Sequence, residues 1–192
     1  GLLERGRVAY LVGTVGMHKS RIGAHWGIAL HTGTPIYGRA VEQSHFVHLS
    51  WENGFDEDAR RAQANSTRLG LSQAVVESAT HWDLSDESRA IVDVDDTSLR
   101  PTTLWGEIGV MLRSIEGHKF VLFDSLYNAL RFSGQAKINE TAVRECINWL
   151  DREARTLDFT GLMLQHPSQA GKNQGNAGYS EAWNNAPRVQ FH

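Results

Sequence analysis

The segment VAYLVGTVGMHKS, residues 8–20, decides how the rest of the sequence is interpreted. Its first five residues form a β-branched, aliphatic and aromatic run, which predicts a buried strand over Val8–Val12. Glycines follow this strand, and a run rich in Ile, Ala, Trp and Leu then predicts a helix over Lys19–His31. In this order of strand, glycine-containing turn and helix, backbone N–H groups and a helix N-terminus can surround phosphate oxygens.

Residues 13–20 nearly match the nucleotide-binding pattern G-x-x-x-x-G-K-[ST]. Lys19 is expected to reach the β and γ phosphates, and the hydroxyl of Ser20 to bind Mg²⁺. The departure is His18, which stands where the pattern has glycine; histidine tolerates a positive φ better than most residues. The alternative is a plain strand-to-helix turn with a solvated lysine. The predicted nucleotide contacts are Gly13, Thr14, Val15, Gly16, Met17, His18, Lys19, Ser20 and Arg21.

An acidic residue closes a second apolar strand. Phe120–Phe123 predicts a buried strand, and Asp124 follows it at the edge where a parallel sheet presents its ligands. Asp124 is therefore predicted to hold Mg²⁺ through a water molecule and to fix the hydroxyl of Ser20. An aspartate after a buried strand is otherwise often only a helix cap.

A glutamate ends the predicted strand Phe46–Ser50. Glu52 lies in the sequence LSWENG, beside an Asn-Gly turn, where a carboxylate could polarise an attacking water molecule. The alternative is a surface acid at a strand end, and three nearby acids compete for the role: Asp56, Glu57 and Asp58.

A histidine closes the predicted strand Gly161–Gln165. A polar side chain at His166 would lie at the same edge as Asp124 and could sense the γ-phosphate, although a single histidine is more often structural. Other histidines show no metal-ligand spacing, so zinc is not expected: His25, His31, His45, His48 and His81.

The remaining periodicity predicts one α/β domain with an open parallel sheet. Ala90–Val94 is predicted as another strand of that sheet. Leu71–Ser88 and Pro167–Gly178 resist assignment. Helices are predicted over Asp56–Arg68, Thr102–Ile115 and Thr141–Arg155, the last with Val143, Ile147, Leu150 and Ala154 on one face.

The composition is that of an ordinary globular protein. The 192 residues fit one domain, and a net charge of −3 provides no broad basic face for holding nucleic acid. Cys146 is the single cysteine and cannot form an internal disulfide, so a cytoplasmic location is expected. No apolar run is long enough to cross a bilayer, so no membrane association is expected. Because the chain starts at Gly1 and stops at His192 in a strand-like run, we expect a fragment of a longer polypeptide.

Taken together, these motifs resemble the RecA-like ATPase core of the plasmid RepA-type hexameric helicases and their phage relatives. The resemblance covers most of the chain and includes GTVGMHKS, LSWENG, FVLFDSL, LMLQHPSQ and GYSEAWNNAPRVQF. It implies hydrolysis of ATP with Mg²⁺ on a RecA-like α/β fold. It also implies that Glu52 is the catalytic base, that His166 senses the γ-phosphate, and that Arg188 is an arginine finger offered to a neighbouring subunit.

The resemblance further implies a homo-oligomer, a hexameric ring that moves single-stranded DNA during phage or plasmid replication. Loops 132–139 and 168–178 would face the channel and contribute Lys137 and Lys172; the alternative is two exposed loops with incidental lysines. The alternative function is a nucleotide-dependent DNA-binding or assembly module of the recombinase type without unwinding activity. Two features depart from the family: His18 in the loop, and a chain that ends before the remaining strands of a complete core.

Overall fold

A six-stranded parallel sheet forms the centre of the computed structural model, which describes residues 3–14, 16–85, 90–95, 98–133, 140–165 and 190–191. The strand order is β3-β2-β6-β8-β1-β9, and every neighbouring pair is parallel. The strands are β1 (Val8–Val12), β2 (His45–Ser50), β3 (Thr80–Asp83), β6 (Lys119–Asp124), β8 (Phe159–Gln165) and β9 (Gln190–Phe191).

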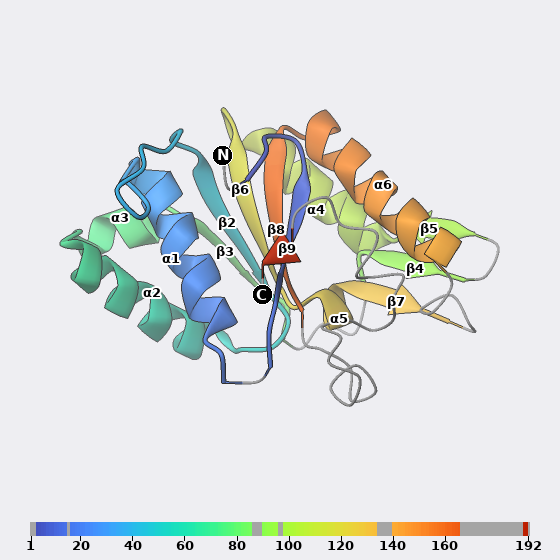
Figure 1. Cartoon of the computed structure of the whole chain (residues 1–192), viewed down its shortest axis with the longest axis horizontal. Coiled ribbons are helices and arrows are strands. Elements are labelled where there is room, and N and C mark those ends of the chain that lie inside the picture. Colours follow the sequence, from blue (N-terminus) through green and yellow to red (C-terminus); the bar gives the residue numbers. More distant parts are fainter. Residues whose placement is uncertain are drawn as a thin grey trace.

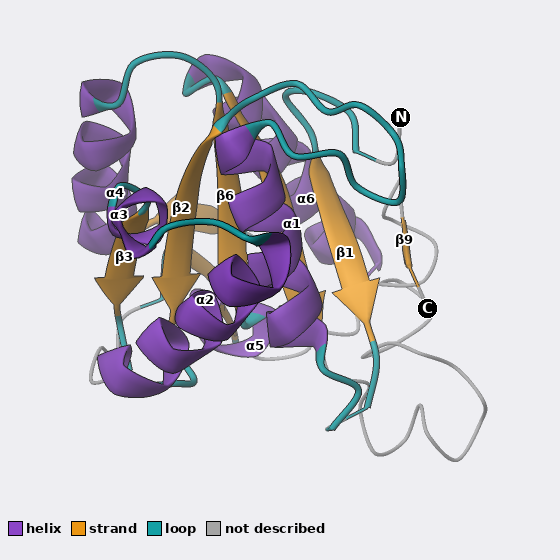
Figure 2. Cartoon of the chain, turned by 90° about the vertical axis from the view of Figure 1, so that its left-hand side faces the viewer, coloured by secondary structure: helices purple, strands orange, loops and turns teal. Residues whose placement is uncertain are grey.

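Helices cover both faces of this sheet, as Figures 1 and 2 show. One face carries α1 (Lys19–Thr32), α2 (Phe55–Leu69) and α3 (Gln73–Glu77), and the other carries α4 (Thr103–Ser114) and α6 (Glu140–Thr156). A short helix, α5 (Leu126–Ala129), follows β6. This three-layer arrangement confirms the predicted RecA-like α/β fold with a mainly parallel sheet.

The central strands β1, β6 and β8 carry continuous apolar runs because both faces of these strands are buried. In β1, Ala9 and Leu11 pack in the cluster that contains Ile28 of α1, whereas Val8, Tyr10 and Val12 pack in the cluster that contains residues of α4 and α6. Alternate residues of one strand therefore serve two separate cores. This explains why the sequence shows continuous apolar runs rather than an alternating pattern.

Ala90–Val94 belongs to a second sheet, so its predicted place in the main sheet is wrong. There, β4 (Val92–Val94) pairs antiparallel with β5 (Leu99–Pro101) and parallel with β7 (Leu130–Phe132). The N–H and hydroxyl of Ser98 donate to the carboxylate of Asp95 at 2.8 and 2.9 Å, which stabilises the turn between β4 and β5. An apolar run identifies a buried strand but does not specify its partner.

The unassigned stretch Leu71–Ser88 contains α3 and the edge strand β3. The sequence of β3 is THWD, and three of its four residues are half-buried while the fourth is exposed. A short polar edge strand of this kind has no apolar run, which is why the sequence pattern missed it.

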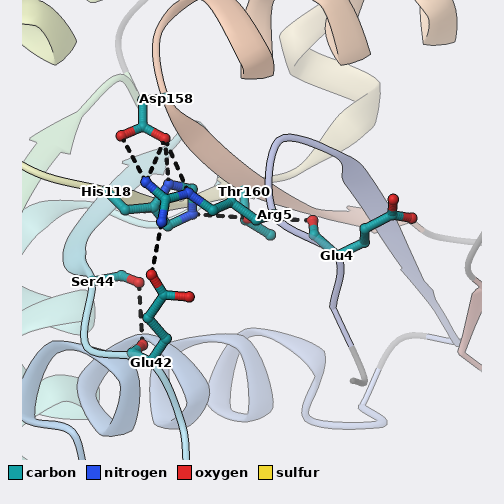
Figure 3. Close-up of polar contacts among 7 residues, drawn as sticks. All are labelled: Glu4, Arg5, Glu42, Ser44, His118, Asp158 and Thr160. Atoms are coloured by element: carbon teal, nitrogen blue, oxygen red, sulfur yellow. Dashed lines mark hydrogen bonds and ion pairs between the residues drawn. The ribbon is translucent and has the colours of Figure 1, made fainter.

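A polar network joins the N-terminal segment to the amino ends of β6 and β8 (Figure 3). The guanidinium of Arg5 lies between Glu42, at 2.7 Å, and Asp158, at 3.1 Å. His118 contacts Asp158 through Nδ1 at 2.9 Å and Thr160 through Nε2 at 3.0 Å. The hydrogen bond from His118 and the charge of Arg5 lower the pKa of Asp158. The polar side chains at this edge therefore satisfy one another.

Helix α6 packs as its sequence predicts. Its predicted apolar face is buried in the core cluster that also contains residues of α4 and β1; the residues of this face are Val143, Ile147, Leu150 and Ala154. Cys146 is also buried, and burial raises the pKa of its thiol to about 12, in agreement with a packing role. Within the described residues, no helix is long and apolar enough to span a membrane.

Replacing either of two helical glycines by alanine should change the stability in opposite directions. A Cβ at Gly27 of α1 would lie 2.3 Å from the ring of Phe46, whereas a Cβ at Gly106 of α4 would meet no atom within 4 Å. Gly27→Ala should lower the free energy of unfolding by about 1–3 kcal/mol through overpacking. Gly106→Ala should raise it by up to about 1 kcal/mol through helix propensity. Urea unfolding followed by circular dichroism tests both; changes of the same sign would contradict the packing of α1 on β2.

Candidate functional site

The turn between β1 and α1 has the backbone conformation that its sequence requires. His18 adopts φ 57° and ψ 27°, in the left-handed region, and Gly16 adopts φ 87°. Histidine tolerates this conformation better than most residues, which agrees with its standing where the pattern has glycine. Gly13 is partly exposed, and Thr14, Gly16, Met17 and His18 are exposed, as is Arg21 in the first turn of α1. Val15, also predicted to contact nucleotide, lies outside the described residues.

Backbone hydrogen bonds hold the start and end of this turn. The N–H of Gly13 donates to the carbonyl of Gln165 at 3.2 Å, continuing the pairing of β1 with β8 beyond the last strand residue. The N–H of Met17 donates to the carbonyl of Thr14 at 3.3 Å, and that of Ile22 to the carbonyl of His18 at 2.9 Å. The turn is thus fixed to the carboxyl edge of the sheet and leads directly into α1.

Lys19 is buried beneath the turn, with 6% of its surface exposed. Its ammonium donates to the carbonyls of Gly13 at 2.7 Å and Thr14 at 3.1 Å. Burial lowers the pKa of Lys19, while the negative charges of Glu52 and Asp124 act in the opposite direction. The structure therefore brings Lys19 close to both acids that the sequence singled out.

Asp124 is the last residue of β6 and faces Ser20 at the start of α1. Burial raises the pKa of Asp124 to about 6, and a hydrogen bond from the Ser20 hydroxyl opposes that shift. The second carboxyl oxygen, Oδ2, is buried and has no hydrogen-bond partner among the described residues. A hydroxyl beside a carboxylate with one unsatisfied oxygen fits a hard cation such as Mg²⁺, which prefers oxygen ligands.

Glu52 lies at the same edge, just beyond β2. Ser50 is opposite Asp124 in the pairing of β2 with β6, and the N–H of Trp51 donates to the carbonyl of Asp124 at 2.6 Å. Two of the three acids that competed with Glu52 have other interactions. Glu57 pairs with Arg60 and Arg61, and Asp58 faces Arg61 and His81.

Two predicted site residues, His166 and Arg188, lie outside the described residues. Loop 168–178 and positions 134–139 of the other expected channel loop lie outside them as well. Gln165, directly before His166, is buried at the end of β8, and its Nε2 has no hydrogen-bond partner among the described residues. The sequence also missed one grouping: His48 and His81, assigned no metal-ligand arrangement, lie beside Asp58 in a possible metal-ligand cluster.

Comparison with known proteins agrees with this geometry. The site and the layered parallel sheet define a RecA-like P-loop ATPase, and a family model described as the AAA domain matches residues 1–172. The chain belongs to this AAA domain family.

Among solved structures, the chain is similar in fold to the crystal structure of the RadB recombinase, with a TM-score of 0.51 and 13% sequence identity. The similarity covers 85% of this chain and 63% of the RadB chain. No curated protein matches the sequence.

Substitutions at His18 test the left-handed conformation of the turn. His18→Val should lower the free energy of unfolding by about 1–2 kcal/mol, because β-branched residues are strained at positive φ. His18→Gly should leave it within about 0.5 kcal/mol, because glycine adopts this conformation freely but has more entropy when unfolded. Thermal unfolding and binding of a fluorescent ATP analogue check both variants. Equal stability of the valine and glycine variants would contradict the observed turn.

Proposed function

We propose that this chain is the Mg²⁺-dependent, ATP-hydrolysing motor domain of a ring-forming DNA helicase in phage or plasmid replication. The observation that carries the ATPase part is the contact of Ser20 with Asp124 beside the buried ammonium of Lys19. A phosphate-binding turn, a cation-binding pair and a nearby acid at one sheet edge are the parts that phosphoryl transfer to water needs. The helicase part is supported by the sequence resemblance.

The turn and Lys19 would bind the nucleotide phosphates. Backbone N–H groups at the start of α1 point to the carboxyl edge, where the helix N-terminus favours negative charge. The ammonium of Lys19 would exchange the carbonyl of Thr14 for phosphate oxygens, a small movement for a flexible side chain. Mg²⁺ held by Ser20 and Asp124 would neutralise charge on the β and γ phosphates during transfer.

Glu52 would act on the water molecule that attacks the γ-phosphate. It is exposed and near Lys19, so its carboxylate can reach solvent and the phosphate site together. A carboxylate placed there would orient the water and accept its proton.

A ring would bring residues of neighbouring subunits to each nucleotide and to a shared channel. Arg188 would reach the nucleotide of a neighbouring subunit, where an arginine can accelerate transfer by ~10³ or more. His166 would sense the γ-phosphate and transmit its presence to the loop that follows, residues 168–178. Loop 132–139 would contribute Lys137, and loop 168–178 would contribute Lys172, to a basic channel for single-stranded DNA. The channel would be basic although each chain carries a net charge of −3.

The second candidate is a nucleotide-dependent assembly module of the recombinase type. The RadB structure of similar fold is that of a recombinase, and His18 in the phosphate loop favours slow turnover. In this function, ATP occupancy would organise subunits on DNA without separating strands.

Substitutions at the carboxyl edge separate nucleotide binding from hydrolysis. Lys19→Ala should abolish both, because it removes the cation that holds the phosphates. Glu52→Gln should preserve ATP binding and lower kcat by about 10²-fold or more, because the amide cannot accept the proton. Asp56→Asn, an exposed acid four residues away, serves as the matched control and should keep full turnover. A Glu52→Gln enzyme with normal kcat would refute the assignment of the base.

Oligomer mass and strand displacement separate the two candidate functions. The helicase proposal predicts a hexamer with a non-hydrolysable ATP analogue and single-stranded DNA, and unwinding that Arg188→Ala abolishes while ATP binding persists. Robust DNA-stimulated hydrolysis without unwinding by the full protein would favour the assembly module instead.

A further inference from the structure

A cluster of two histidines and one aspartate lies between β2, β3 and α2. His48 and His81 are directly opposite each other in the parallel pairing of β2 with β3, so their side chains share one face. Asp58, in the first turns of α2, lies against them. Its Oδ2 is 3.8 Å from Nε2 of His81, and the two imidazole rings meet edge to face with centroids 4.9 Å apart. One ligand atom from each residue lies within 4.8 Å of the others.

The Ser50 hydroxyl lies beside Asp58, but four buried polar atoms of this cluster lack a hydrogen bond of good geometry among the described residues. They are Nε2 of His48, Nε2 of His81, and Oδ1 and Oδ2 of Asp58. The Asp58 side chain is 1% exposed and His48 is 6% exposed, so bulk water does not satisfy them. Leaving a buried polar atom without a partner is unfavourable, and more so for a charged group. Four such atoms gathered in one place call for a ligand that satisfies them together.

Arg61 contacts one oxygen of Asp58, and the other oxygen lies toward the histidines. Arg61 Nη1 is 3.7 Å from Asp58 Oδ1 while Arg61 Nε pairs with Glu57 at 2.9 Å, and Asp58 Oδ2 is the oxygen near His81. Asp83, beside His81, adds negative charge, and its oxygens accept N–H bonds from Phe55 and Ser85.

We propose that His48, Asp58 and His81 bind one divalent transition-metal ion of the Zn²⁺ class, at a site distinct from the Ser20–Asp124 pair. Two imidazole nitrogens and one carboxylate oxygen are ligands that Zn²⁺ takes at about 2.0–2.2 Å, with water in the fourth position. Tetrahedral bonds of that length place ligand atoms about 3.3 Å apart, so His81 and Asp58, now 3.8 Å apart, must approach by about 0.5 Å, and no pair by more than about 1.5 Å. The three residues line a cavity of about 430 Å³, which has room for the water ligand.

The metal would join the end of β2 to the start of α2. The segment between those two elements, residues 51–54, carries Glu52. A bond from the metal to Asp58 on one side and to His48 on the other would restrain this segment and position Glu52. This consequence rests on the proposed role of Glu52, whereas metal binding itself does not.

Titration of the metal-stripped protein, prepared without a histidine tag and without nucleotide, tests the site. Co²⁺ should bind at one ion per chain and give the visible absorption of a tetrahedral complex, and Zn²⁺ should displace it. Zn²⁺ should also raise the Tm, because a ligand that binds only the folded state stabilises it. Absence of a stoichiometric complex would overturn the proposal and leave a polar cluster only.

Variants assign the ligands. Asp58→Asn and His81→Asn should each weaken Co²⁺ binding by about tenfold or more, since each removes a ligand. His45→Asn is the matched control, because His45 and His31 form a similar ring pair, with centroids 5.1 Å apart, outside the cluster. Asp124→Asn should also retain Co²⁺ binding while losing Mg²⁺-dependent turnover, which separates this proposal from the proposed ATPase. Undiminished binding in both cluster variants would refute the ligand assignment.

Ring-nitrogen NMR of the unmodified protein decides the question if the cluster variants fail to fold. Of the nine histidines, two should show a Zn²⁺-dependent shift of Nε2 at one equivalent. Shifts spread over other histidines, or none, would overturn the site.

Discussion

The parallel register of four neighbouring strands is the constraint on which the candidate site depends. Because β1, β8, β6 and β2 all run in the same direction, their carboxyl ends meet at one edge of the sheet. Two backbone bonds extend this pairing into the loops, from Gly13 to Gln165 and from Trp51 to Asp124. Residues that are more than 100 positions apart in the chain thereby contribute to one site.

The two edges of the sheet differ in how their polar groups are satisfied. At the amino edge, Arg5, His118 and Asp158 satisfy one another, and no ligand is needed. At the carboxyl edge, Asp124 Oδ2 and Gln165 Nε2 are buried without hydrogen-bond partners among the described residues. Buried polar groups in native proteins are normally paired, so the unpartnered atoms at the carboxyl edge agree with the proposal that this edge binds a ligand.

Strand β2 connects the core under α1, the proposed metal site and the candidate nucleotide site. Every second side chain of β2 lies on the face that carries α1 and α2; these are Phe46, His48 and Ser50. Phe46 packs in the core under Gly27, and His48 belongs to the cluster with Asp58. Ser50 lies opposite Asp124. Because β2 is buried between β3 and β6, a change at His48 would act on Glu52, which lies only four residues further along the chain.

The sequence by itself determined the elements whose pattern is local. The glycine turn, the apolar strands and the amphipathic α6 follow from residues a few positions apart, where steric limits and burial act directly. Only the tertiary structure decided which strands pair, because an apolar run in the sequence does not specify its neighbouring strand. It separated β4 into a second sheet, revealed β3 at the edge, and brought His48 to His81 and Asp58. Those contacts join side chains that are 10 to 33 positions apart, a separation that strand register and helix packing bridge and that spacing in the sequence does not encode.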